Sequence, residues 1–202
     1  TDGLDLSENV SNTLPSSDDG TSLSQPVFST PARRHDITKP ACQNTQTVFQ
    51  KTYGGSSGSE YARVGKQTAD GGYAFAGYTT GFGTGTISAY MVKADVNGIV
   101  EWSKSYGGNS SDKAKSFTQT SDGGYILLGN TYSFEFSSLL VQFYAIRIDA
   151  IGDTLWTRSI GGGSSEFGDD VLETSDGGYL FVGNSPGFGP GGEDVYVVKT
   201  DG

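Results

Sequence analysis

Three acidic residues recur at a fixed distance from a glycine-rich motif, and they are the first candidates for binding chemistry. Glu60, Asp112 and Glu166 each precede the aspartate of an Asp-Gly-Gly-Tyr block by ten residues. Carboxylates gathered at one end of a repeated structure could bind a cation. Calcium usually takes roughly six to eight oxygen ligands, and nothing else in these columns supplies them. We therefore expect the three acids to cap turns by accepting backbone N–H hydrogen bonds, with no metal bound.

Residues suited to catalysis are sparse. Catalysis usually combines unlike groups, such as a nucleophile beside a histidine, whereas repeated columns supply like groups. The single histidine, His35, and the single cysteine, Cys42, lie outside the repeats, and no H-E-x-x-H motif occurs. A carboxylate pair for glycoside hydrolysis could still occur among the 23 acidic residues. The sequence predicts no enzyme, no catalytic residue and no cofactor; a polysaccharide-degrading domain is the less favoured alternative.

An internal repeat is the strongest pattern in the chain. An Asp-Gly-Gly-Tyr block occurs three times, with spacings of 52 and 54 residues, so that one unit returns about every 53 residues. Aromatic residues, basic residues and a second aspartate recur at nearly the same spacing. The repeated positions are Asp70, Gly71, Gly72 and Tyr73; Asp122, Gly123, Gly124 and Tyr125; Asp176, Gly177, Gly178 and Tyr179; and the aromatic column Phe49, Trp102 and Trp156.

Each unit is expected to contain four short strands. Asp-Gly-Gly favours a tight hairpin turn, because glycine reaches positive φ at little cost. The run that follows, such as 125–128, is continuously apolar, which indicates a strand buried on both faces. The next run, 144–149, alternates between apolar and polar residues and leads through a turn into a strand that carries Trp156. Such four-stranded antiparallel sheets, packed face to face between like neighbours, predict an all-β fold made of β-propeller blades; an open solenoid is the alternative.

The motifs resemble a known group of repeats. The hairpin 144–156 is similar to the tryptophan-docking motif of quinoprotein-type propellers, in which the tryptophan lies between adjacent blades. The wider pattern of residues 47–202 resembles the DGGY-repeat propellers of secreted and cell-surface proteins, common in Bacteroidota. The resemblance implies a scaffold, adhesion or protein-binding module, exported to the outer-membrane surface by a type IX route. It implies no quinone cofactor.

The repeat also predicts the domain organisation. Residues 1–46 hold four of the six prolines and no periodic pattern, and we expect a linker or extended segment there. Residues 47–53 would form a lone strand, 59–105 and 112–160 two blades, and 166–202 a partial blade. Because known rings have roughly four to eight blades, we expect a fragment of a longer chain or, as the alternative, half of an assembled ring. The expected partners are other segments or subunits that complete the propeller.

Departures from the repeat are the best places to seek a binding site. Phe82, Phe134 and Phe188 share one column and are expected to be scaffold. The loop between the second and third strands of the middle unit is longer and more apolar than its counterparts. If exposed, its residues would contact a surface protein, or a glycan in the alternative of a lectin-like propeller. If buried, its apolar residues would be a packing elaboration, which is the slightly favoured interpretation. This candidate partner-binding loop comprises Tyr132, Phe136, Leu139 and Leu140.

Charge and hydropathy exclude two classes of partner. With 13 basic against 23 acidic residues the net charge is −10, which disfavours nucleic acid and anionic lipid. No run of about 18 apolar residues is present, so we expect no direct insertion into a membrane. The expected location is extracellular or at the cell surface.

Overall fold

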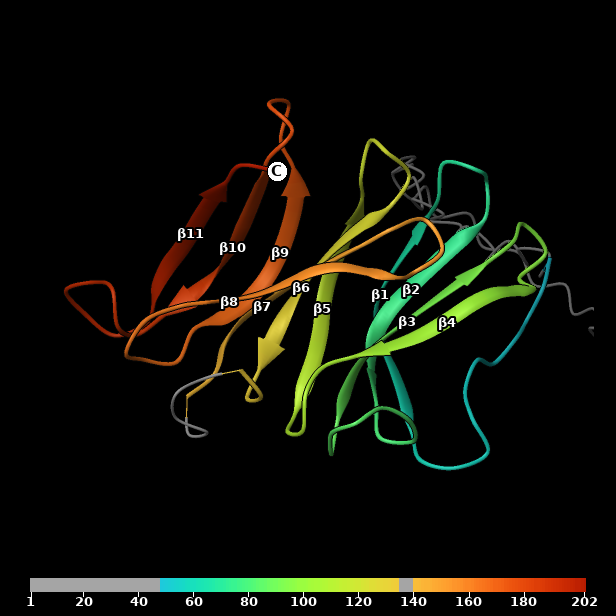
Figure 1. Cartoon of the computed structure of the whole chain (residues 1–202), viewed down its shortest axis with the longest axis horizontal. Helices are drawn as coiled ribbons and strands as arrows, with labels where there is room; N and C mark the ends of the chain where they lie inside the picture. Colours follow the sequence, from blue (N-terminus) through green and yellow to red (C-terminus); the bar gives the residue numbers. More distant parts are fainter. Residues whose placement is uncertain (1–47, 135–139) are drawn as a thin grey trace, which may run out of the picture. The chain divides into compact units, whose positions relative to one another are not determined.

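Antiparallel strands make up the regular structure of the chain. The computed structural model describes residues 48–134 and 140–202, so the linker expected at 1–46 lies outside the described residues. Over these two ranges there are eleven strands in three sheets and no helix, which confirms the all-β prediction (Figure 1). The first sheet comprises β1 (Glu60–Gln67), β2 (Tyr73–Thr79), β3 (Ser88–Ala94) and β4 (Val100–Tyr106); the second comprises β5 (Asp112–Gln119), β6 (Tyr125–Thr131), β7 (Gln142–Ile148) and β8 (Thr154–Ile160); the third comprises β9 (Phe167–Glu173), β10 (Tyr179–Ser185) and β11 (Asp194–Thr200).

The Asp-Gly-Gly blocks form the turns between the first two strands of each sheet. In the second sheet the N–H of Thr120 donates to the carbonyl of Gly124 at 2.9 Å, and the N–H of Gly123 donates back to the carbonyl of Thr120 at 2.9 Å. Gly123 has a φ of 87°, a conformation that glycine adopts without strain. The other two blocks make the same pair of hydrogen bonds. The repeated motif is therefore the hairpin turn that the sequence predicts.

The central strands of the second sheet are buried on both faces. On β6, Tyr125 and Leu127 belong to an apolar cluster shared with the first sheet, while Ile126 and Leu128 belong to a cluster shared with the third. All seven residues of β7 are buried. The continuously apolar run at 125–128 thus has neighbours above and below it, as its sequence indicates.

The last strand of one sheet is joined to the next sheet at one edge. The indole Nε1 of Trp102, on β4, donates to the carbonyl of Ala150 at 3.1 Å. The hydroxyl of Tyr106, on the same strand, donates to the carbonyl of Gly152 at 2.9 Å. Both acceptors lie in the turn between β7 and β8. The aromatic column therefore fixes how the first sheet packs on the second.

Backbone hydrogen bonds join the sheets near the start of their first strands. The N–H of Asp112 donates to the carbonyl of Ile87 at 2.9 Å, and the N–H of Glu166 donates to the carbonyl of Val141 at 2.7 Å. The two bonds connect the first and second sheets and the second and third sheets at equivalent positions. Successive sheets are therefore related by the same contacts, used twice.

Residues 48–53 pack on the first sheet without being a strand. The sequence predicts a lone strand at 47–53, yet no strand is assigned within 48–53. The Tyr53 hydroxyl still donates to the carbonyl of Gly98 at 3.1 Å, and the Phe49 ring lies 5.6 Å from that of Tyr73. These contacts reproduce those that β4 makes with the second sheet. Residues 48–53 thus lie where the last strand of a preceding sheet would lie.

The third sheet has three strands and one exposed face. Val195 and Val197, on β11, are 80% and 51% exposed, whereas the equivalent strand of the second sheet, β7, is buried throughout. Tyr196 and Val198, on the opposite face of β11, pack against the second sheet. Among residues 48–134 and 140–202, only β10 pairs with β11.

Deleting one core ring tests the packing between sheets. Phe143 is fully buried between the second and third sheets, so we expect Phe143→Ala to lower the free energy of unfolding by about 3–5 kcal/mol. Phe134→Ala removes the same atoms from a side chain that is 46% exposed, and we expect a markedly smaller loss. Urea unfolding followed by tryptophan fluorescence measures both. Equal losses would contradict this account of the core.

Candidate binding surface

The three acids at the start of each first strand organise loops. Asp112 is fully buried, and its carboxylate accepts hydrogen bonds from the hydroxyl of Thr131 at 2.5 Å, from the hydroxyl of Ser133 at 2.7 Å and from the N–H of Gly108 at 2.8 Å. These donors satisfy the buried charge from within the chain. The arrangement is that of a loop cap.

The other two acids use similar donors. Glu60 accepts from the hydroxyl of Thr79 at 3.0 Å, while Glu166 accepts from the hydroxyl of Ser185 and the N–H of Gly162, each at 3.2 Å. Across the described ranges no group of three or more His, Cys, Asp or Glu side chains is arranged to hold a metal ion. The acid column therefore presents no ligand set for a cation.

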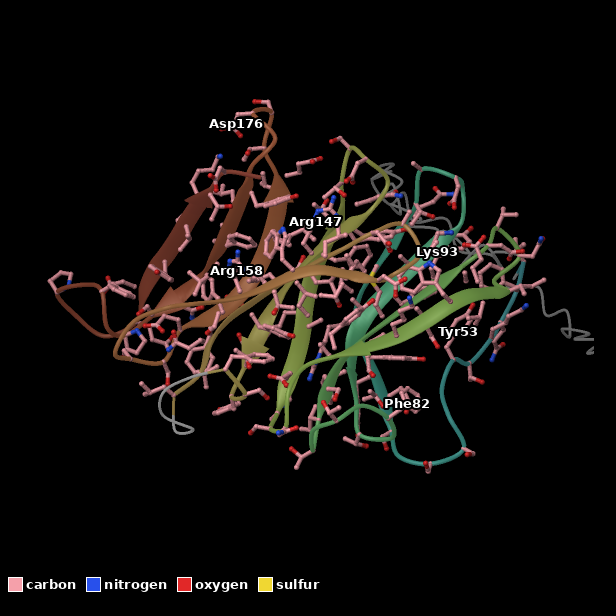
Figure 2. The ribbon with its side chains drawn as sticks, viewed as in Figure 1. Tyr53, Phe82, Lys93, Arg147, Arg158 and Asp176 are labelled. Atoms are coloured by element: carbon pink, nitrogen blue, oxygen red, sulfur yellow. The ribbon has the colours of Figure 1, made fainter. Side chains whose placement is uncertain are left out.

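Phenylalanines of the loops explain the Gly-Gly pairs that precede each first strand. The ring of Phe188 stacks on Tyr196 with centroids 4.8 Å apart, and a Cβ added at Gly162 would lie 2.7 Å from its Cζ. Phe82 and Phe134 pack similarly on tyrosines at 5.1 and 5.2 Å. These rings are parts of the scaffold, at the end of the sheets opposite the Asp-Gly-Gly turns (Figure 2, Phe82 and Lys93).

The turn aspartates form ion pairs with the third strand of their sheet. Asp122 accepts from the hydroxyl of Thr120 at 2.6 Å and the N–H of Gly124 at 3.1 Å, and it pairs with Arg147 at 2.5 Å. These hydrogen bonds and the nearby guanidinium lower the pKa of Asp122. The Arg147 side chain is 6% exposed and that of Asp122 is 62% exposed, so a buried guanidinium holds the exposed turn in place (Figure 2).

The first and third sheets repeat this arrangement. The pKa of Asp70 is lowered by the hydrogen bonds from Lys93 and Thr68, and that of Asp176 by the hydrogen bonds from Thr174 and Lys199. Burial disfavours the charge of Lys93, but its pairs with Asp70 and Glu101, at 2.8 and 2.6 Å, prevail and raise its pKa. The repeated aspartates and the basic residues that pair with them therefore stabilise the turns of their own sheets.

The predicted partner-binding loop is described only in part. Phe136 and Leu139 lie outside the described residues. Tyr132 is 37% exposed, and Leu140 is half-buried. Residues 48–134 and 140–202 therefore hold no complete patch from this loop, and its role stays a prediction.

A cluster that the sequence reasoning missed lies where the first sheet meets the second. Tyr61 stacks on Tyr78 across β1 and β2, with centroids 4.7 Å apart and an interplanar angle of 23°. The Arg63 guanidinium and the Lys113 ammonium lie 5.3 and 5.0 Å from the centroid of Tyr78. A signal was present, because the equivalents of Tyr61 and Tyr78 in the second unit are Lys113 and Asn130. We call these four residues, Tyr61, Arg63, Tyr78 and Lys113, the tyrosine–cation patch.

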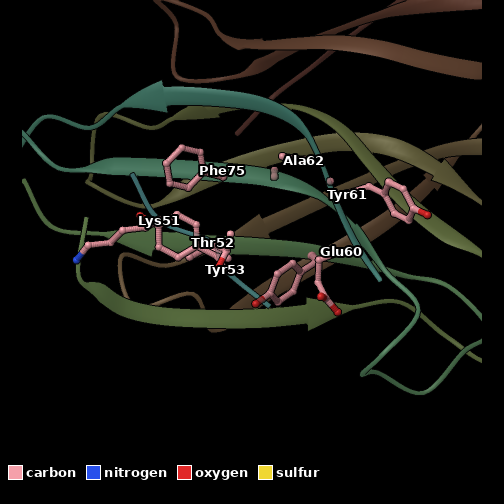
Figure 3. A pocket seen from close by; sticks show the side chains of 11 residues that line it. Lys51, Thr52, Tyr53, Glu60, Tyr61, Ala62 and Phe75 are labelled. Carbon is pink, nitrogen blue, oxygen red and sulfur yellow. The ribbon is translucent and has the colours of Figure 1, made fainter. Parts of the chain in front are cut away.

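A pocket of about 450 Å³ lies between residues 51–53 and the face of the first sheet (Figure 3). Its lining is mainly apolar, with Phe75 and Val92 on its floor and Glu60 beside it. In Figure 3 the ring of Tyr61 extends away from that of Phe75. The corresponding face of the second sheet packs against the first sheet. The pocket therefore lies on a surface that the repeat uses for packing between sheets.

Comparison with known proteins gives no assignment. No family model and no curated protein matches this chain. Over residues 48–134 and 140–202, the structure contains no helix long and apolar enough to cross a membrane.

The lowered pKa of Asp122 makes a prediction for stability against pH. Because the folded state binds this proton less readily than the unfolded state, its contribution is present above the ordinary pKa of 3.8 and is lost as the pH falls below that value. We expect Asp122→Asn to lower stability at pH 7 by at most about 1 kcal/mol, since water screens the exposed carboxylate. Its unfolding free energy should also change less between pH 5 and pH 2, because the variant lacks one of the four described aspartates whose pKa is lowered by folding, namely Asp70, Asp95, Asp122 and Asp176.

Urea unfolding at a series of pH values measures this slope. Thr120→Val, which removes one donor and keeps the carboxylate, should reduce the slope less than Asp122→Asn does. An unchanged slope in Asp122→Asn would show that the turn acids do not govern acid unfolding.

Proposed function

We propose that residues 48–202 are consecutive blades of a β-propeller, of the DGGY-repeat kind found in secreted and cell-surface proteins of Bacteroidota. The observation that carries this proposal is the repetition of one interface, in which the first sheet packs on the second as the second packs on the third. A stack that reuses one contact turns by the same angle at each step, as in a ring or a solenoid. The motif resemblance favours the ring, and with it export to the outer-membrane surface.

The module acts as a non-catalytic scaffold, adhesion or protein-binding domain. The acidic side chains of the repeated columns, such as Asp112 and Asp122, make their hydrogen bonds and ion pairs with loops and turns within the chain. Little repeated chemistry is left for a substrate. A partner protein could instead contact the apolar faces and the backbone edges of the sheets.

The exposed face of the third sheet is the protein-binding surface. It consists of Leu180, Val182, Val195 and Val197, beside the outer edge of β11, which pairs with no strand in the described part of the chain. The same positions of the second sheet, including Ile126 and Phe143, are buried by their neighbour. An open edge and an apolar face together favour addition of a strand.

The chain itself shows which strand would fit. Its fourth-strand positions carry an aromatic residue, then a basic residue two positions on, then tyrosine or isoleucine after two more. The three examples are Phe49, Lys51 and Tyr53; Trp102, Lys104 and Tyr106; and Trp156, Arg158 and Ile160. The partner is therefore another unit of this repeat, which presents such a strand to β11.

Strand addition can be tested with a peptide. We expect a labelled peptide of residues 98–108, which includes Trp102 and Tyr106, to bind the 202-residue chain saturably in fluorescence anisotropy. Replacing Trp102 by alanine in the peptide should weaken binding about tenfold, equivalent to about 1.4 kcal/mol. Val195→Asp together with Val197→Asp in the protein should abolish it.

Val96→Asp is the matched control, because Val96 is 58% exposed in the turn before β4. This variant should bind the peptide as the wild type does. Flat anisotropy with the wild-type protein, or equal loss in the Val96→Asp variant, would overturn the proposed surface.

A further inference from the structure

The tyrosine–cation patch presents a flat aromatic face to solvent. Tyr61 is 48% exposed even though one face of its ring is covered by Tyr78. The two residues are direct cross-strand partners in the β1–β2 ladder, next to an irregularity between Ala62 and Val64. Stacking on Tyr78 holds the Tyr61 ring in a fixed orientation, so its outer face is a preformed platform.

The cations of the patch have no acidic partner among the described residues. Arg63 donates to the hydroxyl of Tyr78 at 3.4 Å, and Lys113 lies over the Tyr78 ring, but neither forms an ion pair in the part of the chain that the structure describes. In a chain with a net charge of −10, two cations over the ring of Tyr78, with no ion pair among the described residues, are unexpected. They leave donors that an anion could use.

The repeat shows how this charge imbalance arises. Between the second and third sheets, Lys115 pairs with Asp169 at 3.2 Å, across equivalent positions of β5 and β9. Arg63 is the equivalent of these two residues on β1, so its counterpart on the neighbouring sheet is Lys115. The column that carries Asp169 in the third unit carries Arg63 in the first, and Lys115 already pairs with Asp169. Arg63 therefore forms no ion pair among the described residues, and its guanidinium is available to an anion.

Both features of the patch restrict the ligand. A flat platform with apolar faces suits the C–H face of a sugar ring, while Arg63 offers a planar fork that matches a carboxylate. Nucleic acid needs many phosphate contacts, which two or three cations in an acidic chain do not provide. An acidic peptide would pair with Arg63 and Lys113 but would make no use of the flat face of the Tyr61 ring.

We propose that the tyrosine–cation patch binds a saccharide that carries a carboxylate, with the sugar ring on Tyr61 and the carboxylate between Arg63 and Lys113. The site goes beyond the scaffold function proposed above and does not depend on it, because it lies between the first and second sheets. It gives the module a specificity for uronic-acid glycans.

Isothermal titration of the 202-residue chain with trigalacturonic acid tests this site. We expect Tyr61→Ala to weaken binding about tenfold, and Arg63→Gln with Lys113→Gln to do the same, since each removes one of the two recognition elements. Tyr61→Phe keeps the ring and should bind normally. The methyl ester of the same trisaccharide should bind about tenfold more weakly, and added salt should weaken only the free acid.

Two variants are matched controls. Phe188→Ala removes an aromatic ring that is 56% exposed on the third sheet, and Lys104→Gln removes a cation that is already paired with Asp153 at 2.5 Å. Both should bind trigalacturonic acid as the wild type does. Saturation-transfer NMR should show contact to the sugar C–H protons in the wild type and not in Tyr61→Ala.

Several outcomes would overturn the inference. These are no binding of trigalacturonic acid by the wild type, equal binding of its methyl ester, and tighter binding of hexaglutamate or single-stranded oligothymidine. Normal binding by Tyr61→Ala would do so too, with its fold checked by circular dichroism. The peptide of residues 98–108 should still bind Tyr61→Ala, which separates failure of this site from failure of the strand-addition surface.

Discussion

Burial of the middle strands on both faces is the constraint on which the rest of the structure depends. Each inner strand carries apolar side chains above and below, so a single sheet would leave two apolar faces in water. The second sheet avoids this because it lies between two like sheets, and its side chains divide between two clusters, one on each face. Packing between neighbouring sheets therefore contributes more to the stability of the fold than the contacts within any one sheet. The outer face of the third sheet has no such neighbour among the described residues, and for this reason we propose it as a binding surface.

The glycines of the repeat follow from this close stacking. A Cβ added at Gly107 would overlap the buried carboxylate of Asp112, and one at Gly162 would press on the Phe188 ring. The Gly-Gly pair thus makes room for an acid that caps the loop and for an aromatic ring that seals it. In the third sheet, Glu166 accepts a hydrogen bond from Ser185 at the start of the loop that carries Phe188. The Phe188 ring then covers Tyr196 on β11.

Much of the fold could be predicted from the sequence, because its signals are local. Turn chemistry at Gly123 and the unbroken apolar run at 125–128 each depend on neighbouring residues in the chain. The structure of residues 48–53 was harder to predict. Their sequence matches the repeated pattern because Phe49 and Tyr53 make the packing contacts of a fourth strand, but a strand also needs a hydrogen-bonded neighbour. The tyrosine–cation patch could not be located without the strand register that sets Tyr61 against Tyr78 and the sheet packing that brings Lys113 over the ring.

The patch also shows why a repeat protein binds through its irregular positions. Where units agree, as at Asp70, Asp122 and Asp176, each polar group finds its partner in the same relative place, and nothing is left for a ligand. Where they differ, the geometry of the junction is kept while the chemistry changes. The Lys115–Asp169 pair satisfies one junction, and the equivalent position on β1 carries Arg63, which forms no ion pair among the described residues. A regular scaffold therefore turns a single substitution in a column into an unmatched charge at a fixed position, and a ligand supplies the missing partner.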